Sequence, residues 1–260
     1  MFHSFKVLWD HRKMLWATTL ADIQSRYAGS VLGMFWLVIY PILMLTAYSV
    51  VYVFIFQVRL EQITTPQYVM LIFSGLIPFL GFSEGLGNSV ISVTSNASLV
   101  KNTLYPIELI PVKAVLFSQC TEVVGLILLT VAVAVTGLLS PWLLLALPLW
   151  SFQVIFGIGV GWLISSINVG LRDSLINIIS LMLMMISPIA YTPDMIPAGL
   201  RPFLRLNPLY YFITAYQHCF IYGEMPPRDI LVAVVLISLG TFLVGFWVFE
   251  KMKQLFDDNI

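Results

Sequence analysis

The sequence predicts an all-α polytopic membrane protein, formed as a single transmembrane domain over residues 1–260. Hydrophobic residues make up 59% of the chain and charged residues only 10%, against roughly 25% charged residues in ordinary soluble domains. The 49 residues of Val123–Leu171 contain no charged side chain and no histidine. Four further charge-free windows cover 27–58, 62–83, 174–193 and 230–249. Because about 20 apolar residues cross the hydrocarbon core as a helix, these windows are typical of membrane spans.

The apolar windows predict six transmembrane helices. A closed β-barrel is excluded, because the runs do not alternate strictly and are too long for strands of roughly ten residues. A turn signal from Thr136 to Pro141 separates the third and fourth helices with almost no loop. The six expected spans are 31–57, 67–90, 109–139, 142–169, 174–191 and 229–250.

Three other segments are not expected to cross the membrane. Residues 1–30 carry apolar side chains near helical spacing among charges, which predicts an amphipathic helix lying in the membrane interface. Residues 92–107 form a polar connection in which Asn96 could cap a helix. Residues 192–228 are rich in proline and tyrosine, and we expect short re-entrant helices there on the outer side. Irregular backbone at that depth must be covered by protein or water.

The distribution of cations predicts that both termini are cytoplasmic. In that orientation the inner side carries nine lysines and arginines and the outer side four, as the positive-inside rule requires. The inner group is Lys6, Arg12, Lys13, Arg26, Lys101, Lys113, Arg172, Lys251 and Lys253, and the outer group is Arg59, Arg201, Arg205 and Arg228.

The chain lacks the motifs of an enzyme. It contains no GxxxxGK[ST], HExxH, GxSxG or GxGxxG sequence, so it is not expected to bind a nucleotide through a P-loop or to hydrolyse one. Cys120 and Cys219 have no metal-ligand spacing and are read as structural thiols. We therefore expect no catalytic residue and no metal site, and the net charge of zero gives no indication of nucleic-acid binding.

Five fragments, taken in order, resemble one family. An amphipathic N-terminal helix leads into RYAGSVLGMFW (26–36) with Pro41 after it, and NASLVKN (96–102) continues into LYPIELIP (104–111). Arg172-Asp173, SPIAY (187–191) and NPL (207–209) follow. This pattern resembles the membrane subunit of ABC-type polysaccharide exporters, which move O-antigen, capsule and teichoic-acid chains, and it covers essentially the whole chain.

The resemblance implies the partners and the location of the protein. It implies a homodimer in the bacterial cytoplasmic (inner) membrane that works with a separate P-loop ATPase subunit, which binds ATP and Mg²⁺, so that this chain has no cofactor of its own. The substrate would be a polysaccharide linked to a polyprenyl pyrophosphate carrier within the membrane lipid. The main alternative function is that of a permease with the same architecture that exports drugs or small lipids. A proton-coupled transporter and a membrane-embedded transferase are less favoured, because the carboxylate chains, internal repeats and acid–base pair they require are not evident.

The resemblance also implies a coupling helix within 92–107 that docks into the ATPase. A short helix with one cation and several apolar side chains suits a groove on a soluble partner, although an ordinary cytoplasmic loop is the alternative. The coupling residues would be Asn96, Leu99, Lys101, Leu104, Tyr105 and Pro106.

A second set of residues would bind the lipid phosphates at the cytoplasmic headgroup level. Arginine suits this role because its planar fork donates two parallel hydrogen bonds to a phosphate. General anchoring of cations to anionic lipid explains the same residues. The headgroup residues would be Arg12, Lys13, Arg26 and Tyr27.

A third set of aromatic residues would line the glycan path. Sugar rings stack on aromatic faces, and weak, multiple sites allow a long chain to pass, but an aromatic belt at the membrane interface needs no substrate. The channel residues would be Tyr40, Tyr48, Tyr191, Tyr211 and Tyr216. Two carboxylates near the hydrocarbon, Glu84 and Glu122, are either functional or paired with Lys113 or Arg172.

Overall fold

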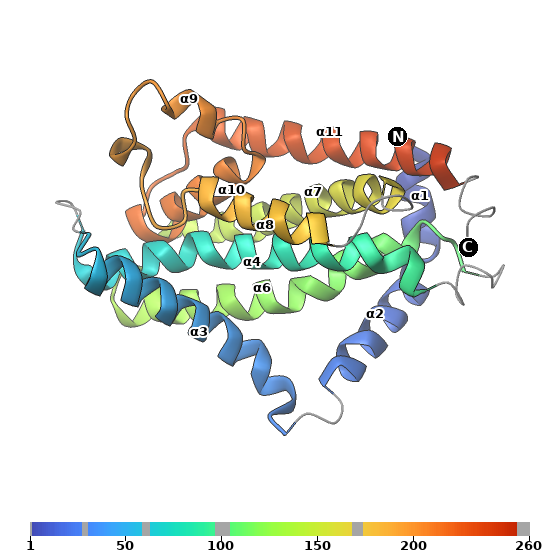
Figure 1. Cartoon of the computed structure of the whole chain (residues 1–260), viewed down its shortest axis with the longest axis horizontal. Helices are drawn as coiled ribbons and strands as arrows, with labels where there is room; N and C mark the ends of the chain where they lie inside the picture. The colour runs from blue at the N-terminus through green and yellow to red at the C-terminus, as the bar shows by residue number, and fades with distance from the viewer. Residues whose placement is uncertain (1, 28–30, 59–62, 97–104, 168–173, 254–260) are drawn as a thin grey trace.

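The computed structural model describes residues 2–27, 31–58, 63–96, 105–167 and 174–253. Over these ranges the regular structure is entirely helical, which confirms the predicted all-α class. Five helical segments are long and apolar enough to cross a membrane: 33–55, 65–93, 109–135, 141–167 and 228–252. Figure 1 shows the long helices side by side, with α2 and α3 diverging from them.

The N-terminal segment folds as two helices where one was expected. Helix α1 (Phe2–Asp10) and helix α2 (Arg12–Tyr27) meet at His11, whose Nδ1 lies 3.0 Å from the carbonyl oxygen of Val7. Helix α2 packs on α6 through the buried side chains of Leu15 and Thr19. The exposed side of this segment carries Trp9 and Trp16, as an interfacial helix would.

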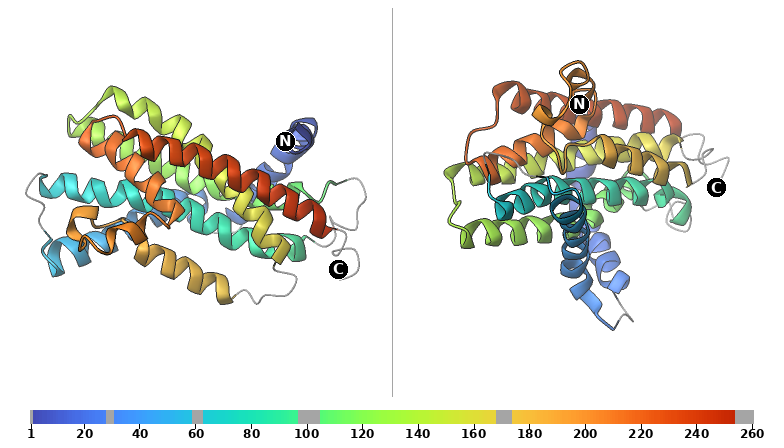
Figure 2. Two further views of the ribbon diagram at one scale, coloured as in Figure 1. Left: turned by 90° about the horizontal axis from the view of Figure 1, so that it is seen from above. Right: turned by 60° about the vertical axis from the view of Figure 1, so that its left-hand side comes forward.

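The first predicted span consists of three consecutive helical pieces: a 3₁₀ turn η1 (Gly33–Phe35), helix α3 (Trp36–Ser49) and a π-helical end η2 (Val50–Ile55). Only 6% of its most apolar window is buried. Figure 2 shows the start of this arm projecting from the bundle, whereas α3 further along contacts α4 and α6. Its exposed apolar side chains, such as Phe35, Leu43 and Phe54, are therefore left to lipid or to another chain. One side of the arm is covered by the protein, since five of its side chains pack partly against the core: Met44, Leu45, Tyr48, Tyr52 and Val53.

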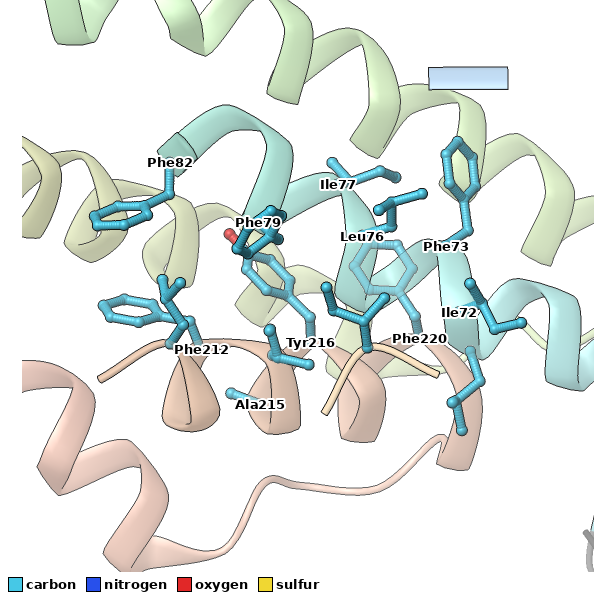
Figure 3. Packing of buried hydrophobic residues seen from close by; sticks show 14 of the residues in the cluster. Ile72, Phe73, Leu76, Ile77, Phe79, Phe82, Phe212, Ala215, Tyr216 and Phe220 are labelled. Carbon is cyan, nitrogen blue, oxygen red and sulfur yellow. The ribbon is translucent and has the colours of Figure 1, made fainter. Parts of the chain in front are cut away.

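Helix α4 (Thr65–Ser95) is the central element of the bundle. The amide N–H of Thr64 donates to Gln67 Oε1 at 2.8 Å, which satisfies one of the unpaired groups at the start of the helix. Most of its apolar window, 78%, is buried. Figure 3 shows its side chains, among them Leu76 and Phe79, meeting Phe212 and Tyr216. The helix extends past the predicted end at 90 into the predicted coupling segment.

Two further long helices, α6 and α7, pack on α4, and a third, α11, packs on α7. Helix α6 (Leu109–Val135) packs along α4, and the turn η3 (Pro141–Leu145) leads into α7 (Ala146–Ile167). Helix α11 (Arg228–Met252) packs closely on α7. At this contact a Cβ atom on Gly159 would lie 2.5 Å from the backbone nitrogen of Phe242, so only glycine permits the approach.

The fifth predicted span is shorter than expected. Helix α8 (Ser174–Ile186) has 13 residues, about 20 Å at 1.5 Å per residue, and ends five residues before the predicted limit of 191. Pro188 explains this end, because the residue before a proline is disfavoured in the helical conformation. Residues 168–173 lie outside the described ranges.

The first four residues after α8 are covered by protein, whereas much of the segment that follows them is exposed. Residues 187–190 are buried, the amide of Gln217 donates to the carbonyl of Pro188 at 2.9 Å, and the Tyr68 hydroxyl donates to the carbonyl of Ala190 at 2.6 Å. Short helical pieces then follow: η4 (Pro193–Met195), α9 (Arg201–Leu204), α10 (Pro208–Gln217) and η5 (His218–Tyr222). Asn207 Oδ1 caps α10 by accepting from the N–H of Leu209 at 3.0 Å.

Polar contacts define one end of the bundle, called here the α2 end. Lys253 Nζ pairs with Glu108 Oε1 at 2.6 Å, and Trp162 Nε1 donates to the carbonyl of Glu108 at 2.9 Å. These contacts bring the C-terminal part of α11 and of α7 to the start of α6, where α2 also lies. The short helices α9, α10 and η5 lie toward the opposite end (Figure 1).

Candidate functional site

One candidate site is an open pocket of about 580 Å³, called here the α3 pocket. Four helices contribute to it, α2, α3, α4 and α6. It lies in the region where α2 and α3 diverge from the α4–α6 pair (Figure 1). Its lining residues are Arg26, Trp36, Tyr40, Leu80, Ser83, Glu84 and Thr121.

An ion pair forms the polar part of the α3 pocket. Arg26, in the last turn of α2, pairs with Glu84 Oε1, and Thr121 Oγ1 donates to Glu84 Oε2 at 2.8 Å. The guanidinium carbon of Arg26 also lies 4.8 Å from the centre of the Phe117 ring. Glu84 is mostly buried, with 17% of its side chain exposed, so removal of Arg26 would leave a poorly solvated carboxylate.

The pocket combines two kinds of surface. Trp36 and Tyr40 present aromatic rings from α3, whereas Arg26 and Glu84 present opposite charges from α2 and α4. Such a site can hold an amphiphilic ligand by stacking on its apolar or sugar face and by bonding its polar groups. Within the described ranges no group of three or more His, Cys, Asp and Glu side chains could hold a metal ion.

A second pocket of about 290 Å³ adjoins the first, and we call it the α2 pocket. Arg26 lines both pockets. Lys113 of α6 reaches into the α2 pocket with only 6% of its side chain exposed, and its Nζ pairs with Asp22 Oδ2 at 2.9 Å and donates to Asn96 Oδ1 at 3.3 Å. The other lining residues are Ser25, Asn88, Ile91, Ser92, Ser95, Ile110, Ala114 and Phe117.

The predicted headgroup residues do not form one site. Arg26 lines both pockets, whereas Arg12 and Lys13 are exposed at the start of α2, about 21 Å away along a helix of 1.5 Å rise. Arg12 Nη1 donates to the carbonyl of Trp9 at 2.7 Å. The side chain of Tyr27 lies outside what the structure describes.

The predicted coupling segment is described only at its borders. Asn96 follows α4 as its C-cap, and its Nδ2 donates to the carbonyl of Ser92 at 2.8 Å. The hydroxyl of Tyr105 lies 3.3 Å from Thr18 Oγ1, and burial raises the pKa of this tyrosine. Pro106 directly precedes the first turn of α6. Leu99, Lys101 and Leu104 lie outside the described residues, so their coupling role stays a prediction.

The predicted channel tyrosines divide into three groups. Tyr40 lines the α3 pocket, and Tyr48 lies further along α3, with its ring 6.0 Å from the ring of Tyr52 and nearly parallel to it. Tyr191 and Tyr211 are partly exposed, and their hydroxyls donate to the backbone carbonyls of Ile186 and Arg205.

Tyr216 has a different environment. It is completely buried in α10, where it packs against α4 (Figure 3). A side chain with no exposed surface contributes packing to the core and cannot contact a passing glycan in this conformation. The burial arises because α10 presents several of its faces to protein, which an aromatic-rich sequence does not reveal.

Neither of the two carboxylates near the hydrocarbon pairs with Lys113, which was one of their two expected partners. Glu84 pairs with Arg26, and Lys113 pairs with Asp22. Glu122 is completely buried, and neither carboxylate oxygen has a hydrogen-bond partner among the described residues. Arg172, the other expected partner of the two carboxylates, lies outside the described residues. Asn88 and Thr121 line the two pockets but were not predicted as site residues, because an uncharged polar residue in a span carries no signal of its own.

Comparison with known proteins identifies the family. The family model of the ABC-2 type transporter matches residues 13–221. The chain is 26% identical to the O-antigen export system permease protein RfbA of Myxococcus xanthus over 100% of both chains. It is 31% identical to a protein of the same name from Klebsiella pneumoniae, over 94% of this chain and 93% of that one. The polysialic acid transport protein KpsM of Escherichia coli is 24% identical over 92% and 93% of the two chains. The chain therefore belongs to the ABC-2 type transporter family, as a membrane subunit.

Proposed function

We propose that this chain is the transmembrane subunit of an ATP-driven exporter that moves a lipid-linked, O-antigen-like polysaccharide across the bacterial inner membrane. The observation that carries the proposal is the match over nearly the whole chain to relatives named O-antigen export permeases. The α3 pocket supports it, because an aromatic wall beside an ion pair suits the junction between a sugar and a charged lipid headgroup.

ATP hydrolysis is assigned to a separate subunit. The sequence contains no P-loop, so the phosphates of ATP have no backbone cradle in this chain. The segment 92–107 is proposed to dock on that subunit, at the α2 end. This end carries Lys113, Lys251 and Lys253, which supports a cytoplasmic location for it and for both termini.

A second copy of the chain is proposed to complete the channel. The arm formed by η1, α3 and η2 exposes large apolar side chains along most of its length, although it belongs to the same domain as the buried α4. Two such arms facing each other would enclose a path with Tyr40 and Tyr48 along it, which extends from the α3 pocket along the length of α3.

The test is a deletion in the native bacterium with its ATPase subunit left intact. Surface polysaccharide should be lost and lipid-linked polysaccharide should accumulate inside the cell, and expression of this chain should restore export. Tyr40→Ala should lower surface polysaccharide per assembled complex. Leu236→Ala should not, because Leu236 lies on α11, away from the arm, with 65% of its surface exposed, and lines neither pocket. A deletion strain with normal surface polysaccharide would refute the proposal.

A capsule polysaccharide is the second candidate substrate. The similarity to a protein named for polysialic acid transport favours it, although the identity of 24% is lower than that to the O-antigen relatives. The deletion strain separates the two candidates, because the glycan that accumulates inside the cell is the glycan that the complex exports.

A further inference from the structure

We propose that a buried site between α4, α6 and α7 binds one internal water molecule, with a protonated Glu122, Gln119 and Gln153 as its hydrogen-bond partners. These three helices pack on one another. The site is built around a small cavity that shares no lining residue with the α3 pocket or the α2 pocket. It is therefore independent of the ligand that those pockets hold and of the proposed function.

Glu122 supplies the acid group of the site. Its side chain is completely buried on α6 and lies against α4, where a Cβ atom on Gly81 would be 2.7 Å from Glu122 Cβ. Neither carboxyl oxygen has a hydrogen-bond partner among the described residues, and none of the ion pairs found there includes Glu122. An ionised carboxylate without a partner is too costly in an apolar interior, so the group takes up a proton. Glu122 then offers one O–H donor and a carbonyl acceptor.

Gln153 of α7 supplies an acceptor that requires a donor. Its Nε2 donates to the carbonyl of Pro78 on α4 at 2.9 Å, which fixes the orientation of the amide. The other amide atom, Oε1, is buried and has no hydrogen-bond partner among the described residues. A buried acceptor without a donor costs free energy that a bound O–H group would recover.

Gln119 supplies the donor of the site. Trp150 Nε1 donates to Gln119 Oε1 at 2.9 Å, so Nε2 is the atom of this amide that remains free to donate to Glu122 or to a ligand. The amide lies beside the Glu122 carboxyl, but the two groups do not meet in direct hydrogen-bond geometry. A water molecule bridges polar groups that are separated in this way.

A cavity of about 10 Å³ lies where these side chains converge, and its lining includes Gly81, Gln119, Gln153 and Gly157. A volume of about 10–15 Å³ is the smallest that holds one water molecule. Glycine keeps this space open at position 157, because a Cβ atom there would meet Val115 Cγ1 at 3.2 Å and no other neighbouring atom within 4 Å. The cavity therefore has the size and the polar groups that one water molecule requires.

The lining favours water over a metal cation. Such a cation surrounds itself with several oxygen atoms, whereas Gln119 and Gln153 are the only residues of the cavity lining with a side-chain oxygen. One of these oxygens, Gln119 Oε1, is already bonded to Trp150. A water molecule has two donors, which suit Gln153 Oε1 and the carbonyl oxygen of Glu122, and it accepts from Gln119 Nε2.

Infrared spectroscopy of the full-length chain tests the protonated carboxyl. The protein is measured at neutral pH in dodecyl maltoside, a detergent without a carbonyl group. We expect the C=O stretching band of a protonated carboxyl in the wild type and its loss in Glu122→Gln. The carboxylates held in ion pairs, Asp22, Glu84 and Glu108, should give no such band. If Glu122→Gln does not fold, Glu122→Asp assigns the band by shifting it. A wild-type spectrum without this band would overturn the inference.

Gly157→Ala tests the water molecule, because its methyl group fills the cavity without removing any polar group. The band of Glu122 should shift to higher wavenumber, since its C=O group loses the hydrogen bond from the water. Gly240→Ala is the matched control, because Gly240 lies on α11, has no neighbour within 4 Å of an added Cβ atom and does not line the cavity. Tyr216→Phe is a second control, because Tyr216 also lies within electrostatic reach of Glu122. Neither control should move the band.

Each other result would overturn the water site. An unchanged band in Gly157→Ala would show that no water bonds to Glu122, and an equal shift in Gly240→Ala would reduce the effect to general changes in helix packing. A shift in Tyr216→Phe in place of Gly157→Ala would assign the partner of Glu122 to the tyrosine hydroxyl. A band that appears only after sodium is replaced by choline would assign the site to a cation. Normal surface polysaccharide in the deletion strain would refute the proposed function and leave these spectra unaffected.

Discussion

Helices α3 and α4 both belong to long apolar segments, yet α3 is mostly exposed and α4 is mostly buried. The segment 33–55 is the more hydrophobic of the two, but 6% of its apolar window is buried against 78% for α4. Hydrophobicity therefore identifies both as spans without saying what covers them. In α4 the cover is protein, namely α6, α7 and α10. In α3 it must be lipid or a second chain, and the α3 pocket lies where the two environments meet.

The strongest test of this difference is a matched pair of leucines. Leu76 of α4 is completely buried, whereas Leu43 of α3 has 54% of its surface exposed. Leu76→Ala should lower the free energy of unfolding by about 2–5 kcal/mol, because it leaves a cavity in the core. Leu43→Ala should change it by about 0.5 kcal/mol or less. Thermal unfolding of the two variants in the same detergent measures both.

Equal losses in the two leucine variants would break the comparison. They would mean that Leu43 is covered in the purified protein, and a second copy of the chain is the proposed cover. The same measurement at several protein concentrations checks this, because a dimer contact makes the unfolding temperature depend on concentration.

A smaller effect is expected from two glycines within α4 itself. A Cβ atom on Gly81 would lie 2.7 Å from Glu122 Cβ, which is fixed to the backbone of α6, whereas a Cβ atom on Gly87 would have no neighbour within 4 Å. Gly81→Ala should destabilise the protein by about 1–3 kcal/mol, as overpacking does. Gly87→Ala should be neutral or stabilise it by up to about 1 kcal/mol, because alanine is the better helix former. Unfolding temperatures that order the two variants the other way would show that α4 and α6 are not packed at Gly81.

The sequence predicts spans better than it predicts sites, for a physical reason. Span prediction depends on the free energy of moving side chains from water to hydrocarbon, a local property that any window of residues reveals. The ranges of α4, α6, α7 and α11 accordingly lie close to the apolar windows. The fifth predicted span differs, because α8 ends at Ile186 although the apolar run continues. Pro188 ends the helix there, since the residue before a proline disfavours the helical conformation.

Sites depend on contacts between distant residues. Arg26 and Glu84 were both conspicuous as charges near spans, but they are 58 residues apart and nothing in either neighbourhood indicates that they pair. Lys113 was expected to pair with Glu84 or Glu122, yet its partner Asp22 lies on an N-terminal helix expected to rest in the interface. Tyr216 was expected to line the glycan path, because it lies in a tyrosine-rich segment. Packing of α10 against α4 instead places its ring in the core.

The aromatic side chains give the smallest expected effect and test the comparison by function. Tyr48 and Tyr52 stack on the exposed arm, and Tyr216 is buried against α4. If the arm lines the glycan path, Tyr48→Ala with Tyr52→Ala should lower export per assembled complex, by about fivefold for each aromatic contact of about 1 kcal/mol. Tyr48→Phe should retain export because the stacking face remains.

Tyr216→Ala should instead reduce the amount of assembled complex and leave export per complex unchanged. Tyr216→Phe should be harmless, since the hydroxyl has no hydrogen-bond partner among the described residues. Surface polysaccharide divided by the quantity of purified complex separates the two cases. A wild-type ratio in the Tyr48 and Tyr52 double variant would remove α3 from the glycan path, and a lowered ratio in Tyr216→Ala would show that the core tyrosine becomes exposed during transport.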